Sequence, residues 1–413
     1  MSLPSSNSSN SSHPSTSVDR RRATPIRVGF VMHVMQVAGA EVLVKQIIER
    51  LEDQIEPTVF CLDALGELGQ QLRDAGVPVV VLDRRPGLDR NVPRRLAAEV
   101  RNRGIDLLHA HQYTPFFYSA LARLLHRAPV KILFTEHGRH YPDIVSPKRR
   151  WANRLLLQRY ADVTTACCDF STRALQQIEG FSAAVTLVNG VDLGQLPPRG
   201  DRASQADLRR RLGLDLDRPY AACIARFHPV KDHAMLIRGW QLVHQQRPDA
   251  RLLLVGDGPE RESIESLVQQ LARTASPSCP ASQTFPDSIE FWGIRSDVAD
   301  ILRAVDLFTL TSVSEAASLT LLEAMASQCP AVVTDVGGNG EHVSEGVEGF
   351  LVPRGDHESL ADRCGELFDN PKQTQAMGAA ARARVIDKFD LQQTIAAYHR
   401  HYQSLAPTKT PQP

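Results

Sequence analysis

The chain has 413 residues, more than one hydrophobic core usually organises, so two domains are expected. Its 47 basic residues balance 47 acidic ones, which argues against electrostatic binding of nucleic acid. The sequence contains no run of about eighteen apolar residues, so no membrane-spanning helix is predicted. The seven cysteines form no metal-type Cys-x-x-Cys pair, and this pattern fits a reducing cytoplasm.

Residues 1–24 are rich in Ser, Asn and Pro and predict a disordered tail without the apolar core of a signal peptide. From residue 25 to 195, apolar strands alternate with amphipathic helices. This alternation is typical of a parallel sheet covered on both faces, so a doubly wound Rossmann-like domain is predicted. Its strands are expected at Arg27–Met32, Thr58–Leu62, Val77–Leu82, Asp106–His109, Val130–Thr135, Val163–Cys167 and Thr186–Val188.

Residues 196–218 are expected to link this domain to a second doubly wound domain at 219–388. A final helix at 389–405 and a polar tail at 406–413 follow, and a mobile surface loop is predicted at Thr274–Asp287. Ligands of open parallel sheets bind at the carboxyl ends of the strands, so the two domains predict one cleft. The second set of strands is expected at Tyr220–Ala225, Arg251–Gly256, Ser288–Trp292, Leu307–Leu310, Ala331–Thr334 and Gly349–Val352.

The stretch Ser314–Gly338 combines two carboxylates with a nearly all-apolar helix. Glu315 is expected in a loop, whereas Glu323 lies inside a helix that has almost no polar face. A carboxylate buried there needs hydrogen-bond donors to offset its loss of water. A helix N-terminus at Ala317–Thr320 is suited to phosphate. The stretch therefore predicts a site for a phosphorylated sugar.

The first strand-helix junction of the second domain carries two cations. Arg226 ends the strand, and Lys231 is expected at the start of the next helix. Two cations beside a helix N-terminus can neutralise a diphosphate and stabilise it as it leaves. If each residue is considered alone, the alternative to a phosphate site is that both side chains are ordinary surface charges.

Glycines mark the next two junctions of the second domain. Gly256 and Gly258 permit a tight turn and close approach of a ligand, but the full Gly-x-Gly-x-x-Gly pattern of a dinucleotide site is lacking. At Gly293 and Ile294, the backbone either contacts a nucleotide base or merely joins a strand to a helix.

In the first domain, the turn at Val37–Ala40 precedes a helix and offers a phosphate or sugar contact. Histidines end two of the strands. His137, followed by Gly138, is the better candidate to contact sugar or acceptor hydroxyls, because the end of its strand should face the cleft. A purely structural role for this histidine is equally open.

The pattern Asp215–Asp217 formally matches a metal clamp, but it lies in the linker with no strand before it. Because no other cluster has ligand spacing, no metal site is predicted. Residues 147–160 predict a basic amphipathic helix with Trp151, the composition of a membrane-interface element. A packed helix with a charged outer face is the alternative.

Together these motifs resemble the retaining glycosyltransferases of family 4, over about Arg27 to Tyr402. The likeness depends on AGAE, NGVD and VGDGPE, on Arg226 with Lys231, and above all on Glu315 with Glu323 followed by DVGGN. It implies the GT-B fold, in which two doubly wound domains face a central cleft and the C-terminal helix returns to the first domain.

The same likeness implies residue roles. Arg226 and Lys231 would bind the diphosphate of a nucleotide-sugar, Glu323 the ribose hydroxyls, and Glu315 the transferred sugar. The expected catalytic residues are Arg226, Lys231, Glu315 and His137. The expected donor-binding residues are Gly39, Gly256, Gly258, Gly293, Ile294, Ser318, Leu319, Thr320 and Glu323.

The implied reaction moves a sugar from a nucleotide-diphosphate donor to a polysaccharide, lipid-linked or other envelope-glycan acceptor, with retention of configuration. The nucleotide-sugar is a co-substrate, and neither a metal nor another cofactor is expected. The expected location is cytoplasmic, with residues 147–160 offering contact with the inner face of the membrane. A nucleotide-sugar epimerase of the same fold and a non-catalytic nucleotide-sugar-binding subunit remain as alternatives.

Three positions depart from the family pattern. Ala38 stands in place of the first of two glycines before Ala-Glu, Ala316 and Ala317 replace the common Gly and larger apolar residue, and Gly340 stands where Pro is common. None of these departures removes a charged residue of the expected site. They bear instead on the choice of sugar, and weaker turnover is the alternative.

Overall fold

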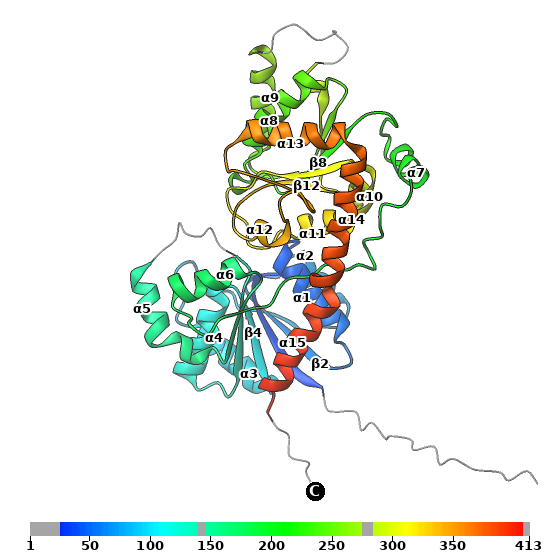
Figure 1. Ribbon diagram of the computed structural model, residues 1–413. Coiled ribbons are helices and arrows are strands. Elements are labelled where there is room, and N and C mark those ends of the chain that lie inside the picture. The colour runs from blue at the N-terminus through cyan, green and yellow to red at the C-terminus, as the bar shows by residue number, and fades with distance from the viewer. Residues whose placement is uncertain (1–24, 139–145, 275–283, 408–413) are drawn as a thin grey trace, which may run out of the picture.

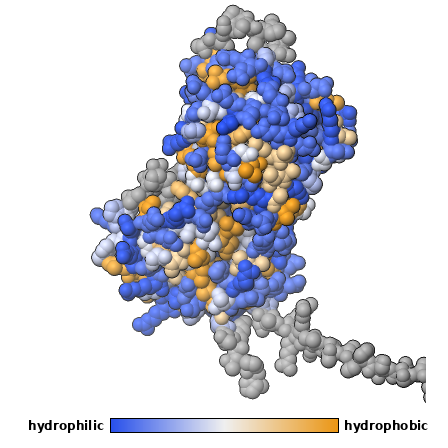
Figure 2. All heavy atoms as spheres, in the orientation of Figure 1, coloured by the Kyte–Doolittle hydropathy of each residue, from blue (hydrophilic) through white to orange (hydrophobic). Residues whose placement is uncertain are grey.

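The computed structural model describes residues 25–138, 146–274 and 284–407, which form two α/β domains connected end to end (Figure 1). The predicted tail 1–24, most of the loop Thr274–Asp287 and the end of the C-terminal tail lie outside these residues. Figure 2 shows that hydrophilic residues cover most of the face in view.

The first domain is built on a seven-stranded parallel sheet of order β3-β2-β1-β4-β5-β6-β7. Its strands are β1 (Ile26–Val34), β2 (Ile55–Ala64), β3 (Val79–Val81), β4 (Leu107–His111), β5 (Lys131–Glu136), β6 (Val163–Ala166) and β7 (Val185–Thr186). Its helices are α1 (Gly39–Arg50), α2 (Glu67–Asp74), α3 (Val92–Arg103), α4 (Tyr113–His126), α5 (Pro147–Leu155) and α6 (Asp169–Ala174).

The second domain has a six-stranded parallel sheet of order β10-β9-β8-β11-β12-β13. Its strands are β8 (Tyr220–Ile224), β9 (Arg251–Val255), β10 (Ile289–Gly293), β11 (Leu307–Leu310), β12 (Ala331–Thr334) and β13 (Gly349–Val352). Its helices are α8 (His233–Gln246), α9 (Arg261–Thr274), α10 (Val298–Ala304), α11 (Leu319–Ala326), α12 (Asn339–His342), α13 (His357–Asp369) and α14 (Pro371–Lys388).

In both sheets the strand order reverses beside the first strand of the domain, between β1 and β4 and between β8 and β11. Such a switch point opens a crevice at the carboxyl ends of the strands, where ligands of this architecture bind. The predicted doubly wound domains are thus confirmed.

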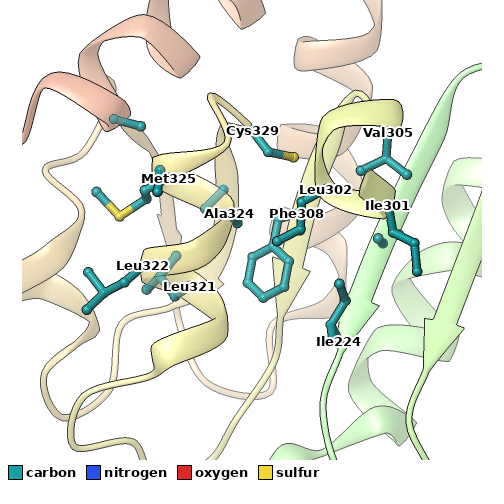
Figure 3. Close-up of a cluster of buried hydrophobic side chains, with 14 of the residues drawn as sticks. Ile224, Ile301, Leu302, Val305, Phe308, Leu321, Leu322, Ala324, Met325 and Cys329 are labelled. Carbon is teal, nitrogen blue, oxygen red and sulfur yellow. The ribbon is translucent and has the colours of Figure 1, made fainter. Parts of the chain in front are cut away.

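Helix α11 is buried as its apolar sequence predicts. Leu321, Leu322 and Met325 are fully buried in one core cluster of the second domain. Phe308 of β11 lies between the α11 side chains and those of α10 (Figure 3). This packing fixes the helix, and with it the direction of its N-terminus.

Two segments differ from expectation. Residues 196–218 contain a helix, α7 (Arg202–Leu212). This helix packs on the second domain, because buried Arg209 donates to both carboxylate oxygens of Asp306 at 2.8 and 2.9 Å. The single helix predicted over 147–160 is wrong. Helix α5 ends at Leu155, and a separate 3₁₀ turn covers Leu157–Tyr160.

The C-terminal helix α15 (Leu391–Leu405) returns to the first domain, as the resemblance implied (Figure 1). Its residues Ile395, Tyr398 and Tyr402 pack into the cluster that contains Val28 and Phe30 of β1. The helix therefore belongs to the core of the domain that the chain left before α7.

This packing predicts that Ile395→Ala destabilises the first domain by about 2–4 kcal/mol, because it opens a cavity between α15 and β1. The free energy of unfolding in urea measures the loss. Gln392→Ala, at an exposed position of the same helix, should stay within about 0.5 kcal/mol of the natural protein. Equal effects of the two substitutions would contradict the packing of α15 described above.

Candidate active site

Backbone hydrogen bonds hold three strand-helix junctions of the second domain side by side. The amide of Phe227 donates to the carbonyl of Asp257 at 3.0 Å, and the amide of Gly256 donates to the carbonyl of Gly293 at 2.8 Å. A Cβ added at Gly256 would lie 2.0 Å from the carbonyl oxygen of Ala225, and one at Gly258 would lie 2.3 Å from that of Phe227. Close approach of the neighbouring loop therefore accounts for both glycines, and the packed loops present Arg226.

Lys231 and Glu315 meet in this structure. Lys231 lies in a 3₁₀ turn just before α8, whose N-cap is Asp232, rather than in the helix itself. Its ammonium group forms an ion pair with the carboxylate of Glu315, and the hydroxyl of Ser312 donates to the same carboxylate oxygen at 2.5 Å. Arg226 is exposed and has no ion pair within the described segments, so it remains available to an anion.

The loop that carries Glu315 is held by a pair of glycines. The amide of Gly338 donates to the carbonyl of Glu315 at 3.1 Å. A Cβ at Gly337 would lie 1.7 Å from the carbonyl oxygen of Glu315, and one at Gly338 would lie 1.9 Å from that of Ala316. Any side chain at either position would displace the loop, which explains the glycine pair in DVGGN.

The first residues of two helices lie close together at the domain boundary. Helix α1 begins at Gly39, and a Cβ there would lie 3.3 Å from Cδ1 of Leu319 at the start of α11. Ala38 gives α1 no side-chain cap, whereas Ser318 caps α11 by accepting from the amide of Leu321 at 3.3 Å. Both helix dipoles favour negative charge in the space between them.

Glu323 lies on the second turn of α11 and is half-buried. Its carboxylate has no hydrogen-bond donor among the residues of the described structure. Burial raises the pKa of this carboxyl to about 7. The side chain is therefore suited to accept hydrogen bonds from a ligand.

His137 follows β5 and stands opposite the Glu315 loop. The next residue, Gly138, has φ of +111°, and a Cβ there would lie 2.3 Å from the Cβ of Ala316 in the second domain. The Nε2 atom of His137 is 2.7 Å from Nδ1 of His111, at the end of β4. Burial lowers the pKa of His137 to about 4, so the ring is neutral near pH 7.

A second contact joins the two domains, and the sequence motifs did not predict it. The amides of Asp169 and Phe170, at the N-terminus of α6, donate to the carboxylate of Glu341 at 2.7 and 2.6 Å. Glu341 belongs to α12 of the second domain. An acidic residue after a glycine pair carries no local signal of such a contact, since its partner lies far away in the chain.

Asp215 and Asp217 do not form a metal clamp. Asp215 accepts from the amide of Asp217 at 3.0 Å and from Nε of Arg218 at 3.1 Å, so it closes its own turn. Across residues 25–138, 146–274 and 284–407, no three His, Cys, Asp or Glu side chains are grouped so that they could hold a metal ion.

The outer face of α5 and of the turn that follows it carries both apolar and basic side chains. Trp151 is 70% exposed, and Leu155 and Leu156 are 44% and 42% exposed. The exposed cations beside them are Lys148, Arg150, Arg154 and Arg159. Within the three described segments, no helix combines the length and the apolar character needed to cross a membrane.

Comparisons with known proteins agree with this architecture. Residues 37–195 match the family described as Glycosyltransferase Family 4, and residues 218–370 match Glycosyl transferases group 1. The chain is 27% identical to N-acetyl-alpha-D-glucosaminyl L-malate synthase of Bacillus anthracis, over 77% of this chain and 79% of that one. It is 24% identical to the lipopolysaccharide core biosynthesis mannosyltransferase LpsB of Rhizobium meliloti, over 90% of this chain and 99% of the relative.

Among solved structures, Anabaena HepE in complex with UDP has the same fold. The two structures superpose with a TM-score of 0.79 and 22% sequence identity, over 92% of this chain and 100% of HepE. The superposition therefore covers nearly the whole length of both chains.

The raised pKa of Glu323 predicts a pH dependence of stability. Its ordinary pKa is 4.5 and its pKa in the folded protein is about 7, so between these values the folded protein binds more protons than the unfolded chain. The free energy of unfolding should therefore fall by about 1–3 kcal/mol as the pH rises through this range. Glu323→Gln, which cannot ionise, should lose less stability between about pH 5 and about pH 8 in urea unfolding. Identical pH dependence of the two proteins would refute the assignment.

Proposed function

Because the chain belongs to the glycosyltransferases of family 4, we propose that it transfers a sugar from a nucleoside diphosphate to an acceptor hydroxyl with retention of configuration. The observation that carries this proposal is that the first residue of α1 lies beside the first residue of α11, and that the loop leading into α11 holds Glu315, which pairs with Lys231.

In this proposal, the donor diphosphate lies between the two helix N-termini. Its charge is neutralised by Arg226 and Lys231, and the backbone amides at Gly39 and at Ser318–Thr320 donate to phosphate and sugar oxygens. These groups neutralise the phosphate charge, which a divalent cation does in other phosphate chemistry. The proposed reaction therefore requires neither a metal ion nor another cofactor.

The remaining donor contacts follow from the same placement. Glu323 accepts from the ribose hydroxyls, which lowers its pKa because hydrogen bonds favour the ionised form. Glu315 contacts the transferred sugar. Gly293 and the 83% exposed Ile294 lie at the next strand end, where they contact the base. Gly256 and Gly258 keep the loop beneath the diphosphate close to Arg226.

Retention follows from displacement on the front face of the anomeric carbon. The bond from that carbon to the diphosphate oxygen breaks while the acceptor oxygen bonds to the carbon on the same side. The leaving oxygen takes the proton of the acceptor hydroxyl, and Lys231 and Arg226 stabilise the remaining negative charge. Closure of the domains excludes water, which limits hydrolysis of the donor.

The named relatives differ in their acceptors, so the acceptor class is inferred from the first domain. We assign the apolar and basic face of α5 to the inner surface of a cytoplasmic membrane. Its cations attract anionic headgroups while Trp151 and Leu155 enter the headgroup boundary. An acceptor attached to a lipid, or growing into an envelope polysaccharide, would be met at that surface.

The proposal is tested by identifying the donor and then removing Lys231. A thermal-shift panel of UDP, GDP, ADP and their sugars identifies the nucleotide, because a bound ligand raises the melting temperature. With that donor, Lys231→Ala should lower the rate of transfer by about 10²- to 10³-fold, since one charge on the leaving group is lost.

Lys372→Ala, which removes an exposed lysine at the start of α14, serves as the matched control and should keep the natural rate. Near-normal transfer by the Lys231→Ala variant would sink the assignment. An epimerase would interconvert nucleotide-sugars without any acceptor. A binding subunit would take up the nucleotide but show neither transfer nor donor hydrolysis.

The membrane assignment predicts that the full chain sediments with phosphatidylglycerol-containing vesicles. The double variant W151S/L155S should bind about ten- to a hundredfold more weakly, because two apolar side chains no longer leave water. Ile386→Ser, at a 49% exposed apolar position of α14, is the control and should bind as the natural chain does. Unchanged binding of the double variant would place the contact elsewhere.

A further inference from the structure

A basic segment follows β3 at the cleft side of the first domain. Residues 83–95, which we call the arginine segment, read DRRPGLDRNVPRR and contain five arginines and two aspartates. All strands of this sheet are parallel, so the residues after β3 lie at the same edge of the sheet as the turn from β1 into α1. The proposed donor site uses none of these residues, so their charge calls for another explanation.

Polar side chains connect the arginine segment to the end of β1. Near the end of β1, Nδ1 of His33 lies 2.9 Å from one carboxylate oxygen of Asp63 in β2, and Nε of Arg84 donates to the other oxygen at 2.7 Å. The three residues thus cross the ends of three neighbouring strands. Adjacent strands lie about 4.8 Å apart, so the segment after β3 is roughly 10 Å from the end of β1. An arginine side chain and a phosphorylated sugar together span such a distance.

Further hydrogen bonds fix the shape of the arginine segment. Buried Asp89 accepts from the amide of Arg85 at 3.2 Å and from the amide of Asn91 at 2.9 Å. It also accepts from the guanidinium group of Arg95 at 3.1 Å. The hydroxyl of Tyr118 on α4 accepts from the amide of Asp89 at 3.0 Å. The backbone that carries the outward side chains is therefore held before any ligand binds, which lowers the entropic cost of binding one.

Two of the five arginines serve the fold, and three do not. Arg84 and Arg95 form ion pairs with the carboxylates of Asp63 and Asp89. The other three are exposed, and their guanidinium groups have no ion pair or hydrogen bond within residues 25–138, 146–274 and 284–407: Arg85, Arg90 and Arg94. Asp83 is the one exposed carboxylate in the segment, so its solvent-facing side carries an excess of positive charge. Guanidinium groups donate paired hydrogen bonds to phosphate oxygens.

The arginine segment lacks the apolar area of a membrane contact. Its one exposed large apolar side chain is that of Leu88. Membrane-interface elements combine basic residues with a continuous apolar face, which α5 has and this segment does not. The segment follows β3 at one edge of the sheet, whereas α5 leads to β6 near the other edge. Its charge therefore fits a phosphate group in the cleft better than a lipid surface.

We propose that Arg85, Arg90 and Arg94 bind a phosphate group of the acceptor, so that the acceptor is a phosphate ester rather than a neutral glycan. This inference rests on the proposed function, because it takes the bound phosphate ester to be the acceptor. The phosphate lies at the arginine segment, and a hydroxyl of the same molecule reaches the donor sugar near the end of β1. A water-soluble phosphate ester and a lipid headgroup share this chemistry.

Phosphate binding can be measured without a transfer reaction. The donor site is first filled with the nucleotide that the thermal-shift panel identifies. Glycerol phosphate is then the probe, and glycerol is the same molecule without the phosphate. We expect glycerol phosphate, and not glycerol, to raise the melting temperature of the full chain. The double variant R85A/R90A should bind glycerol phosphate about ten- to a hundredfold more weakly, because two charged hydrogen-bond donors are lost.

The double variant R127A/R202A removes the same charge elsewhere and is the matched control. Arg127 is exposed between α4 and β5, at the amino ends of the strands, and Arg202 is exposed at the start of α7. This control should bind glycerol phosphate as the natural chain does. If R85A/R90A also binds it as the natural chain does, the phosphate does not bind at the arginine segment and the proposal is wrong.

Vesicles distinguish the two sources of the phosphate ester. Phosphatidylglycerol carries glycerol phosphate in its headgroup. If R85A/R90A weakens binding to glycerol phosphate and to phosphatidylglycerol vesicles alike, a lipid-borne ester is supported, and weaker binding to glycerol phosphate alone supports a soluble one. If only vesicle binding is weakened, the segment contacts a membrane surface, and the proposal of an acceptor phosphate is overturned.

Transfer assays test the role of the phosphate in the reaction. With the identified donor, acceptors are offered in pairs that differ by one phosphate, such as a hexose and its phosphate ester. The natural chain should favour the phosphorylated member at least about tenfold in kcat/KM. R85A/R90A should raise the KM of that member about ten- to a hundredfold and change kcat by less than about threefold, because the lost charges lie away from the reacting atoms. Equal use of both members by the natural chain would refute the proposal.

Failure of this proposal and failure of the proposed function give different results. If no nucleotide binds and no sugar is transferred, the proposed function fails. The glycerol phosphate titration, performed then on the chain without nucleotide, still decides whether the arginine segment binds phosphate. If transfer occurs but R85A/R90A and R127A/R202A use every acceptor equally well, the function stands and the phosphate site is refuted.

Discussion

The backbone around Glu315 and Ala316 is enclosed from two sides, and the site depends on this constraint. Gly337 and Gly338 approach its carbonyl groups from within the second domain, and Gly138 approaches the Ala316 side chain from the first. None of these three positions has room for a Cβ. The enclosed loop leads directly into α11, so the same contacts fix the direction of the Glu315 side chain and of the helix N-terminus behind it.

One departure from the family pattern has a physical explanation in that enclosure. Ala316 replaces a common glycine, and its methyl group occupies the space that a side chain at residue 138 would need. The extra methyl is accommodated because residue 138 is glycine, with φ of +111°. The substitution therefore fills space at the domain boundary. In the proposed mode of binding, its effect falls on the space left for the sugar.

Much of the fold could be predicted because its signals are local. Unbroken apolar strands such as β9 require cover on both faces, and the apolar sequence of α11 requires burial. Other contacts have no local signal. His111 and Glu341 act through partners on other segments, and α7 lies in a stretch whose prolines and charges favoured a linker. Gly256 and Gly258 were assigned to ligand approach, whereas the structure also shows the neighbouring backbone against them.

The ion pair joins Lys231, the proposed partner of the donor diphosphate, to Glu315, the proposed partner of the donor sugar. Without ligand, each charge is offset by the other at low exposure, which avoids the cost of a lone buried charge. A diphosphate offers Lys231 a more highly charged partner, so its arrival releases Glu315. The freed carboxylate keeps the hydrogen bond from the hydroxyl of Ser312 and gains room for further donors, which the hydroxyls of the proposed sugar supply. A nucleotide without sugar would leave Ser312 as the one donor that the structure shows for Glu315, so the exchange favours the complete nucleotide-sugar.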